Sequence, residues 1–372
     1  MKSPWPTKKL GEICEIRMGE TLIEKDLTGE GIPVYSADSL EVPWGFTSNN
    51  RLRFYKGSII IGARGTIGSV KLPTDEIFTA TQTTIVLTPK IKEITSTFLY
   101  YFLRKINFKS IQGGTGIPML TVGTLSSFQI PIPPLPIQQK IVKILDTIQE
   151  AIDIHDKIIE KTKELKKSLM AELFKYGGPS FRKGRKLKKT EIGEIPEDWE
   201  VVRLGDKKIA EIKYGKGKPP EGGKIPVIGS SGIYDWTNKA LIEKPTIVIG
   251  RKGTAGIPHL SMLPCWPSDT AFYLDLNLEK INAKFLYEYI LFKPLSGEHA
   301  KTTLPSLRRE DLENFKIPLP SLPEQQEIAE ILQTVDQKID IERRKKELYE
   351  ELFKTMLNKI MNQEIDVESV DF

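Results

Sequence analysis

The stretch "IPIPPLPIQQKIVKILD", residues 130–146, is repeated with small changes as "IPLPSLPEQQEIAEILQ", residues 317–333. Ten of the seventeen aligned positions are identical, at a constant offset of 187. Proline holds the chain extended and removes backbone donors, so each run predicts a boundary between an extended segment and a helix. Pro136 and Pro323 fit the first turn of that helix, and Glu324 would add a favourable charge at its positive end.

The match extends through both halves of the chain in unchanged order, which indicates a tandem duplication rather than a short-repeat solenoid. Further matched pairs are "IPVYS" (32–36) with "IPVIG" (225–229), "IIIGARGTIG" (59–68) with "IVIGRKGTAG" (247–256), and "FLYYFL" (98–103) with "FLYEYI" (285–290). Short β-branched runs bounded by Gly, Pro and Thr are typical of strands, and the "FLYYFL" type has helical periodicity. Each copy is therefore predicted to be a mixed α/β domain followed by a long helix.

The composition is that of an ordinary globular protein with room for two or three domains, since 39% of the 372 residues are hydrophobic and 28% are charged. The net charge of +5 suggests an acidic partner only weakly. The two cysteines and three histidines lie far apart, so no metal-ligand spacing exists. The sequence has no run of ~18 apolar residues and no apolar core of a signal peptide at its start, so we expect a cytoplasmic location.

Heptad spacing after each proline run predicts two long helices with an apolar seam. One series in the first copy is Ile137, Ile144, Ala151, Ile158 and Leu165. His155 falls on the other series, as a tolerated polar position. Neither segment is interrupted by glycine or proline for about forty residues, which corresponds to helices of about 58 Å. An ordinary core helix and a homodimeric coiled coil are alternatives, but two matched seams in one chain favour pairing within the chain.

The segment between the halves is basic, because "RKGRKLKK" at residues 182–189 carries six cations in eight residues. It is interpreted as a solvated linker, with phosphate contact as the alternative. The predicted boundaries are 1–136 for the first domain, 137–176 for the first helix, 177–195 for the basic linker, 196–323 for the second domain, 324–362 for the second helix and 363–372 for a tail.

Three groups of motifs carry a resemblance to a known family. They are "KTEIGEIPEDWEVVRLGD" (189–206), the proline runs leading into "QQKIVKIL" and "EQQEIAEIL", and "KKSLMAELF" (166–174) near the end of the first helix. Over essentially its whole length the chain resembles the specificity (S) subunit of type I restriction-modification systems. It departs from many members only at the N-terminus, where "PWPTKKLGEI" is a shorter lead-in.

The resemblance implies a fold, a function and partners. The fold would be α/β (α+β), with two mixed α/β target-recognition domains joined and separated by two long antiparallel coiled-coil helices in an internal pseudo-two-fold repeat. Each domain would read one half of a bipartite site in double-stranded DNA, and the helices would set the spacer. Two modification (methyltransferase) subunits would dock on the helices, and restriction (endonuclease/translocase) subunits would join them. S-adenosylmethionine, ATP and Mg would belong to those partners, so this chain is expected to have no cofactor, no metal, no catalytic residue and no membrane contact.

The sequence also lacks the motifs of the catalytic partners. A DNA amino-methyltransferase needs an (N/D)-P-P-(Y/F) tetrapeptide, which does not occur. The glycine-rich turns at 62–68 and 250–256 lack the Lys-Ser/Thr pair of a P-loop and the G-x-G-x-x-G spacing of a dinucleotide site. They are better explained as tight turns that need glycine.

One short pattern leaves an alternative open. Asp198, Glu211 and Lys213 have the spacing of a metal-dependent nuclease motif. The corresponding residues of the first copy are Thr7, Glu15 and Arg17, so that copy lacks the first acid. The main alternative is therefore a solitary nuclease or methyltransferase with an attached recognition domain. A third hypothesis is a protein-binding scaffold whose domains do not touch DNA.

Loops that differ between the copies carry side chains suited to DNA, such as "SNNRLRFYKG" (48–57) against "KYGKGKPPEGG" (213–223). Cations neutralise phosphates, and arginine and asparagine also read base edges. Plain surface solubility is the alternative for each single residue, but Arg64 and Lys252 keep a charge at equivalent positions while the loops around them drifted. The candidate DNA-binding residues are Asn49, Asn50, Arg51, Arg53, Arg64, Lys213, Lys216, Lys218, Arg251 and Lys252.

Overall fold

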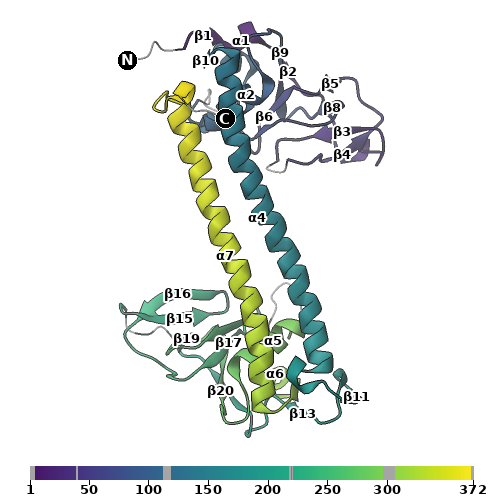
Figure 1. Cartoon of the computed structure of the whole chain (residues 1–372), viewed down its shortest axis with the longest axis vertical. Helices are drawn as coiled ribbons and strands as arrows, with labels where there is room; N and C mark the ends of the chain where they lie inside the picture. The colour runs from purple at the N-terminus through teal and green to yellow at the C-terminus, as the bar shows by residue number, and fades with distance from the viewer. Residues whose placement is uncertain are drawn as a thin grey trace. The chain divides into compact units, whose positions relative to one another are not determined.

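The computed structural model describes residues 5–38, 41–111, 119–217, 219, 221–295 and 306–369, with only the backbone of Lys109 and Ile111. The chain divides into two compact units (Figure 1). Unit 1 comprises Met1–His155 and Lys345–Phe372, and unit 2 comprises Asp156–Arg344. Each unit therefore holds one copy of the duplicated domain and one half of each long helix. The sequence boundaries had instead treated each helix as a segment of its own.

Unit 1 contains two four-stranded sheets. One has the order β2 (Cys14–Met18), β9 (Thr84–Pro89), β6 (Ile59–Gly62), β7 (Val70–Lys71), and all its pairs are antiparallel. The other has the order β4 (Gly45–Thr47), β3 (Ile32–Tyr35), β8 (Ile77–Ala80), β5 (Phe54–Tyr55), with a parallel β3–β8 pair. Strand β1 (Thr7–Lys9) pairs with β10 (Gln129–Pro131), which ties the start of the domain to its end. The helices of this domain are α1 (Leu10–Ile13), α2 (Ser96–Lys105) and α3 (Val122–Ser126), with 3-10 turns η1 (Glu24–Asp26) and η2 (Phe108–Ile111).

Unit 2 repeats this plan. Its larger sheet has the order β14 (Ala210–Tyr214), β20 (Ala271–Leu276), β17 (Thr246–Gly250), β18 (Pro258–Ser261). Its smaller sheet has the order β16 (Gly232–Thr237), β15 (Ile225–Gly229), β19 (Trp266–Pro267), again with one parallel pair. Strand β13 (Glu200–Arg203) pairs with β21 (Lys316–Leu319), and the helices are α5 (Ala283–Phe292) and α6 (Arg309–Glu313). The matched strand orders confirm the predicted duplication and the mixed α/β fold.

The uninterrupted apolar runs of the repeat become strands that are buried on both faces. Along β6, Ile59 and Ile61 point into the main core beneath α2, whereas Ile60 points into a second cluster with Tyr35 and Phe78 of the smaller sheet. Side chains alternate between faces along a strand, so a strand between two cores must be apolar at every position. Strand β17 of unit 2 divides its side chains between two clusters in the same way.

The two long helices are α4 (Leu135–Tyr176) and α7 (Leu322–Met361). Both begin two residues earlier than predicted, and Pro136 and Pro323 occupy the first turn as expected. In unit 2, Lys166 Nζ lies 2.7 Å from Asp336 Oδ2, and Gly178 N–H donates to Glu324 Oε1 at 3.1 Å. The residue number along α7 falls as that along α4 rises, so the helix halves run antiparallel within this unit.

Only part of the predicted seam is buried: Ile137 is buried, Ile144, Ala151 and Ile158 are half-buried, and Leu165 is 53% exposed. In unit 1 the seam consists of Ile141, Leu145, Ile148 and Ile152 of α4 with Phe353, Leu357, Ile360 and Met361 of α7. These residues belong to the same cluster as the domain core, so the helix halves are packed onto the domain. His155, predicted as a tolerated seam position, stacks on Tyr349 with ring centroids 5.4 Å apart. The chain after α7 returns to the same core through Val367 in the turn η5 (Val367–Ser369).

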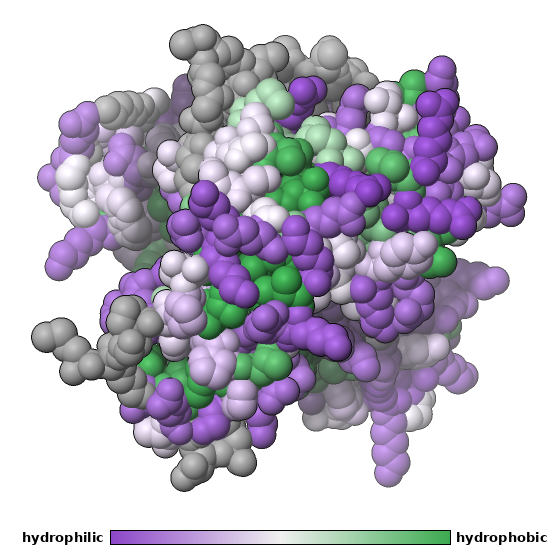
Figure 2. All heavy atoms as spheres, turned by 90° about the horizontal axis from the view of Figure 1, so that it is seen from above, coloured by the Kyte–Doolittle hydropathy of each residue, from purple (hydrophilic) through white to green (hydrophobic). Residues whose placement is uncertain are grey.

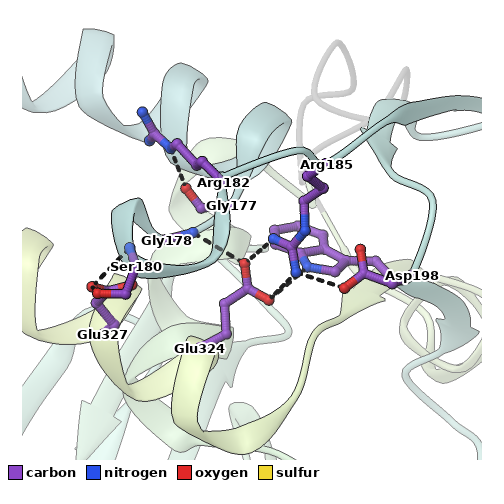
Figure 3. A network of polar contacts seen from close by, with 9 residues as sticks. Gly177, Gly178, Ser180, Arg182, Arg185, Asp198, Glu324 and Glu327 are labelled. Carbon is purple, nitrogen blue, oxygen red and sulfur yellow. Dashed lines mark hydrogen bonds and ion pairs between the residues drawn. The ribbon is translucent and has the colours of Figure 1, made fainter.

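The segment predicted as a solvated linker is folded, which corrects that interpretation. After Gly177, whose φ of 82° ends α4, it forms the turn η3 (Pro179–Phe181) and a hairpin of β11 (Leu187–Thr190) and β12 (Gly193–Pro196). Arg185 bonds both oxygens of Glu324 and reaches Asp198 Oδ2 at 2.6 Å (Figure 3). Arg182 Nε also donates to Gly177 O at 2.9 Å. Lys188 Nζ donates to Glu197 O at 2.8 Å, so three basic residues of the segment have partners within the unit.

Hydrophilic side chains dominate the face seen in Figure 2, and hydrophobic ones gather there in small patches between them. Neither of the long helices, nor any other helix in the described ranges, combines the length and apolar character needed to cross a membrane.

Candidate nucleic-acid interface

The glycine-rich turns present one cation at the same place in each unit. Gly68 N–H donates to Gly62 O at 2.9 Å, and Gly256 N–H donates to Gly250 O at 2.8 Å. A Cβ on Gly62 would lie 2.2 Å from Thr66 O, so this glycine is required by the close approach of the backbone. The sequence interpretation of these segments as tight turns agrees with this geometry.

Arg64 and Lys252 are the exposed charged residues of those turns. Arg64 N–H donates to Thr83 O at 3.1 Å, and Lys252 N–H donates to Thr270 O at 3.3 Å. The backbone of each turn is thereby held against the loop that leads into the last strand of the larger sheet, while the side chain remains exposed to solvent. This gives two cations on rigid supports, as a phosphate contact requires.

Arg251, next to Lys252, is placed differently from the other candidates. Its guanidinium carbon lies 5.4 Å from the ring centroid of Tyr214 and 5.9 Å from that of Phe272. Nη2 also donates to Asp269 O at 3.0 Å. The side chain is half-buried and held by these contacts, so it acts as a support of the turn at least as much as a surface charge.

The loop that carries Asn49, Asn50, Arg51 and Arg53 is organised by the carboxylate of Glu20. Glu20 accepts the backbone N–H groups of Arg51 at 2.8 Å and Leu52 at 3.2 Å. The amide of Asn50 donates to Leu52 O at 3.1 Å, which closes the loop. The side chains of Asn49, Arg51 and Arg53 are exposed, so the loop offers amide and guanidinium groups from an ordered backbone.

The candidates of the second copy are only partly available. Lys213 Nζ lies 2.5 Å from Asp275 Oδ2 and 3.2 Å from Glu211 Oε2. The hydrogen bond to Asp275, and to a smaller extent the one to Glu211, raises the pKa of Lys213 above its usual value. Lys213 therefore stays charged, but the two carboxylates compensate its charge. Lys216 is exposed beside β19. Lys218 lies outside the described residues.

The nuclease-like pattern is not assembled into a site. Asp198 is bonded to Arg185, whereas Glu211 shares Lys213 with Asp275. Within the described part of the chain, no three Asp, Glu, His or Cys side chains come together in a way that could hold a metal ion.

Sequence reasoning did not select a set of exposed aromatic side chains on the edge strands β4 and β16. They are Trp44, just before β4, and Phe46 in unit 1, with Tyr234 and Trp236 in unit 2. Phe46 pairs with Pro33 and Trp236 pairs with Pro226, so these two residues are equivalent by strand register. These residues could have been found from the matched "IPV" strands, because in each copy an aromatic-rich strand at the sheet edge follows them.

Comparison with known proteins identifies the family. The family model described as the type I restriction modification DNA specificity domain matches residues 2–164 and 196–351. The chain belongs to this specificity-subunit family. As a type I specificity subunit it is a DNA-recognition subunit without catalytic chemistry of its own, and the alternative of a solitary nuclease or methyltransferase has no support.

Relatives of this specificity subunit cover most of its length. The MjaVIII specificity subunit of Methanocaldococcus jannaschii is 32% identical over 349 residues, which span 85% of this chain and 78% of that relative. The EcoDI specificity subunit of Escherichia coli is 24% identical over 365 residues, 87% of this chain and 80% of that relative. The crystal structure of a type I S subunit from M. genitalium matches with a TM-score of 0.63 at 19% identity, over 95% of both chains, which supports the fold.

Proposed function

We propose that this specificity subunit reads a bipartite, asymmetric site in double-stranded DNA, with each unit contacting one half. The observation that carries the proposal is that the two units share their scaffold and differ in their loops. Strand order and the proline junctions are retained, whereas the loop after β4, residues 48–53, and the equivalent loop after β16, residues 238–243, differ in sequence. Two copies that read the same half-site would need matching loops, because direct readout depends on individual side chains.

Within this proposal, the exposed cations of the glycine turns contact phosphates, and loop amides and guanidinium groups contact base edges. Arg64 and Lys252 are assigned to phosphates because their turns are equivalent in the two units. Asn49, Arg51 and Arg53 are assigned to the bases because the equivalent loop of the second copy, after β16, has a different sequence. Lys213 is the weakest candidate, since two carboxylates already compensate its charge.

The long helices are proposed to set the spacer between the half-sites and to dock two modification subunits. Helix α4 has 42 residues and α7 has 40, and each passes without interruption from one unit into the other. A continuous helix transmits spacing because every added residue lengthens it by about 1.5 Å.

The chemistry on DNA is proposed to reside in partner subunits, working in the cytoplasm. Modification subunits would bring S-adenosylmethionine, and restriction subunits would bring ATP and Mg. The net charge of +5 is small for a protein that binds two half-sites, so we expect the partner subunits to supply further contacts to the duplex.

An exchange of modules tests the proposal. Residues 196–323 are replaced by the same segment of a relative, and the methylated adenines are mapped in a host that carries the chain and its modification subunit. We expect one half of the methylated site to change while the other half and the spacer remain. The matched exchange of residues 1–136 should change the opposite half. A change of both halves after either exchange would contradict independent reading.

A further inference from the structure

The exposed aromatic residues of β4 and β16 form an aromatic edge in each unit, defined as Trp44 with Phe46 and Tyr234 with Trp236. Their exposed fractions are 37%, 43%, 60% and 49% in that order. Exposure of an aromatic side chain to water is energetically unfavourable. Four such side chains at matched edges of the two units indicate a surface that is covered when the protein functions.

Strand register shows which face of the smaller sheet these residues occupy. Residues directly opposite each other share a face, so Phe46 lies on the face of its partner Pro33. Pro33 and Tyr35 are two residues apart, and Tyr35 packs on Phe78 in the cluster between the sheets. The aromatic edge therefore continues the apolar face of the sheet beyond the core, and Trp236 does the same beside Pro226.

The turn that follows each aromatic edge is built in the same way. Asn49 N–H donates to the hydroxyl of Thr47 at 3.0 Å, and Lys239 N–H donates to that of Thr237 at 3.2 Å. Both threonines are fully buried. A buried hydroxyl that accepts the N–H two residues on holds the turn in one conformation. The sequences "FTSNNR" and "WTNK" thus place asparagine and a cation within five residues after the aromatic residue.

The backbone at this edge is already occupied, which argues against addition of a partner strand. Thr28 N–H donates to Phe46 O at 2.9 Å. In unit 2, Gly222 forms a bridge with Thr237, and a Cβ on Gly223 would lie 2.1 Å from Thr237 O. The loop before β3 or β15 therefore covers the outer backbone of the edge strand, and only its side chains are available to a partner.

The comparison of the copies favours DNA over a protein as the partner. The proline junctions, which both copies need for the same purpose, keep ten of seventeen residues. The aromatic edges keep their position and aromatic character but change identity, from Trp and Phe to Tyr and Trp. Surfaces that meet the same protein in both units would keep their residues, whereas surfaces that meet different base sequences would diverge.

We propose that each aromatic edge contacts the bases of its half-site, with the aromatic side chains against a base step and the Asn, Arg or Lys of the following turn on the flanking base edges and phosphates. Apolar side chains inserted at a base step unstack it, and aromatic rings stack on any base. Asparagine pairs with adenine and cations bind phosphate. This inference rests on the proposed reading of one half-site by each unit and names the residues that do it.

The test uses the chain in complex with its modification subunit and a duplex that carries the methylated site. The double variants are Trp44→Ala with Phe46→Ala, and Tyr234→Ala with Trp236→Ala. We expect each to weaken binding about tenfold or more, the range of one or two lost base stacks. The slope of log affinity against log salt should stay unchanged, because no phosphate contact is removed.

Matched controls are Tyr55→Ala in unit 1 and Leu263→Ala in unit 2. Tyr55 is 60% exposed but neighbours Phe54 along β5, so it points to the opposite face of the same sheet. Leu263 is 71% exposed. Both controls should bind DNA like the original chain. Thermal unfolding checks the fold, and if a double variant is unfolded, Phe46→Leu and Trp236→Leu replace it and should show the same direction of effect.

Three outcomes decide the inference. Tenfold weaker DNA binding with unchanged recovery of the modification subunit supports it. Unchanged DNA affinity overturns it, and so does loss of the modification subunit, which would make the aromatic edge a protein-docking surface. If the complex of the original chain binds all DNA sequences equally, the proposed function itself fails. That failure is seen with the original chain alone, so it is distinguished from a failure of the aromatic-edge inference, which needs the variants.

Discussion

Gln138 Oε1 accepts the backbone N–H of Thr95 at 2.9 Å, and this bond ties the start of α4 to the start of α2. Its amide donates to Glu93 O at 2.6 Å and to Pro133 O at 2.8 Å. Gln325 repeats the pattern with Asn282, Lys280 and Pro320. The repeated phrase therefore builds a joint that sets the direction in which each long helix leaves its domain.

Replacing Gln138 or Gln325 by leucine should destabilise the corresponding unit by about 2–4 kcal/mol, because buried backbone groups lose their partners. Both glutamines are fully buried. Chemical denaturation followed by circular dichroism measures the loss. Gln139→Leu, at the exposed neighbouring position, is the control and should change the unfolding free energy by less than about 0.5 kcal/mol. Equal effects at Gln138 and Gln139 would contradict the joint.

Gly177→Ala should destabilise unit 2 more than Gly184→Ala, although both glycines have positive φ, of 82° and 72°. A Cβ at Gly177 would lie 2.2 Å from Glu324 Oε1 and 2.3 Å from Arg185 Nη1, whereas nothing lies within 4 Å of the corresponding position at Gly184. We expect the free energy of unfolding to fall by about 1 kcal/mol for Gly184→Ala, because of the backbone conformation alone. For Gly177→Ala we expect a fall of about 3 kcal/mol, because the ion pair of Arg185 and Glu324 must also move. Similar losses at the two sites would show that the Glu324 network adds nothing.

Glu288 should make the stability of unit 2 depend on pH. It is buried beside Lys166, and burial raises its pKa to about 7 from 4.5, against the lowering effect of Lys166. The folded chain thus holds the proton more tightly than the unfolded chain. This contribution is complete below pH 4.5 and is lost as the pH rises through about 7.

Between pH 5 and pH 8 the original chain should therefore lose stability relative to Glu288→Gln, whose side chain does not titrate. Denaturation midpoints across this range measure the difference. Glu279→Gln, at an exposed position of the same unit, is the control and should follow the original curve. Parallel curves for the original chain and Glu288→Gln would mean that the effect of Lys166 on the pKa of Glu288 outweighs the effect of burial.

Arg64→Ala and Lys252→Ala should weaken DNA binding by the chain with its modification subunit at all sequences alike. Loss of one phosphate contact lowers the slope of log affinity against log salt by about one. Lys280→Ala, an exposed cation shortly before α5, is the control with no expected change. A change in the recognised bases without a change in slope would assign Arg64 or Lys252 to base edges instead.

Lengthening both long helices should lengthen the unread spacer of the DNA site. Insertion of seven residues after Leu165 and seven after Asp340 preserves the heptad phase and adds about 10 Å to each helix. At about 3.4 Å per base pair this corresponds to about three additional base pairs between unchanged half-sites. The same seven residues inserted after Gly184 lengthen the chain without lengthening a helix and should leave the spacer as it was. An unchanged spacer in an active helix variant would leave the helices as docking surfaces only.

The sequence by itself determined the features that depend on local pattern. The offset of 187 revealed the duplication, the prolines placed the helix starts to within two residues, and the glycine spacing predicted both tight turns. Proline and glycine restrict or free the backbone locally, and the hydrophobic period reflects the local secondary structure. These signals can therefore be recognised without knowledge of the fold. The same reasoning failed for the basic linker, whose structure depends on distant partners.

Only the tertiary structure decided which side chains are available for binding. Arg185 is committed to Glu324, 139 residues away, and Lys213 to Asp275, 62 residues away, so these two cations are already compensated within the protein. Trp236 resembles a core residue in sequence, yet it is half-exposed because β16 is the edge of its sheet. Exposure and charge compensation are properties of packing between distant segments, and the buried side of a strand is assigned only when its neighbours are in place.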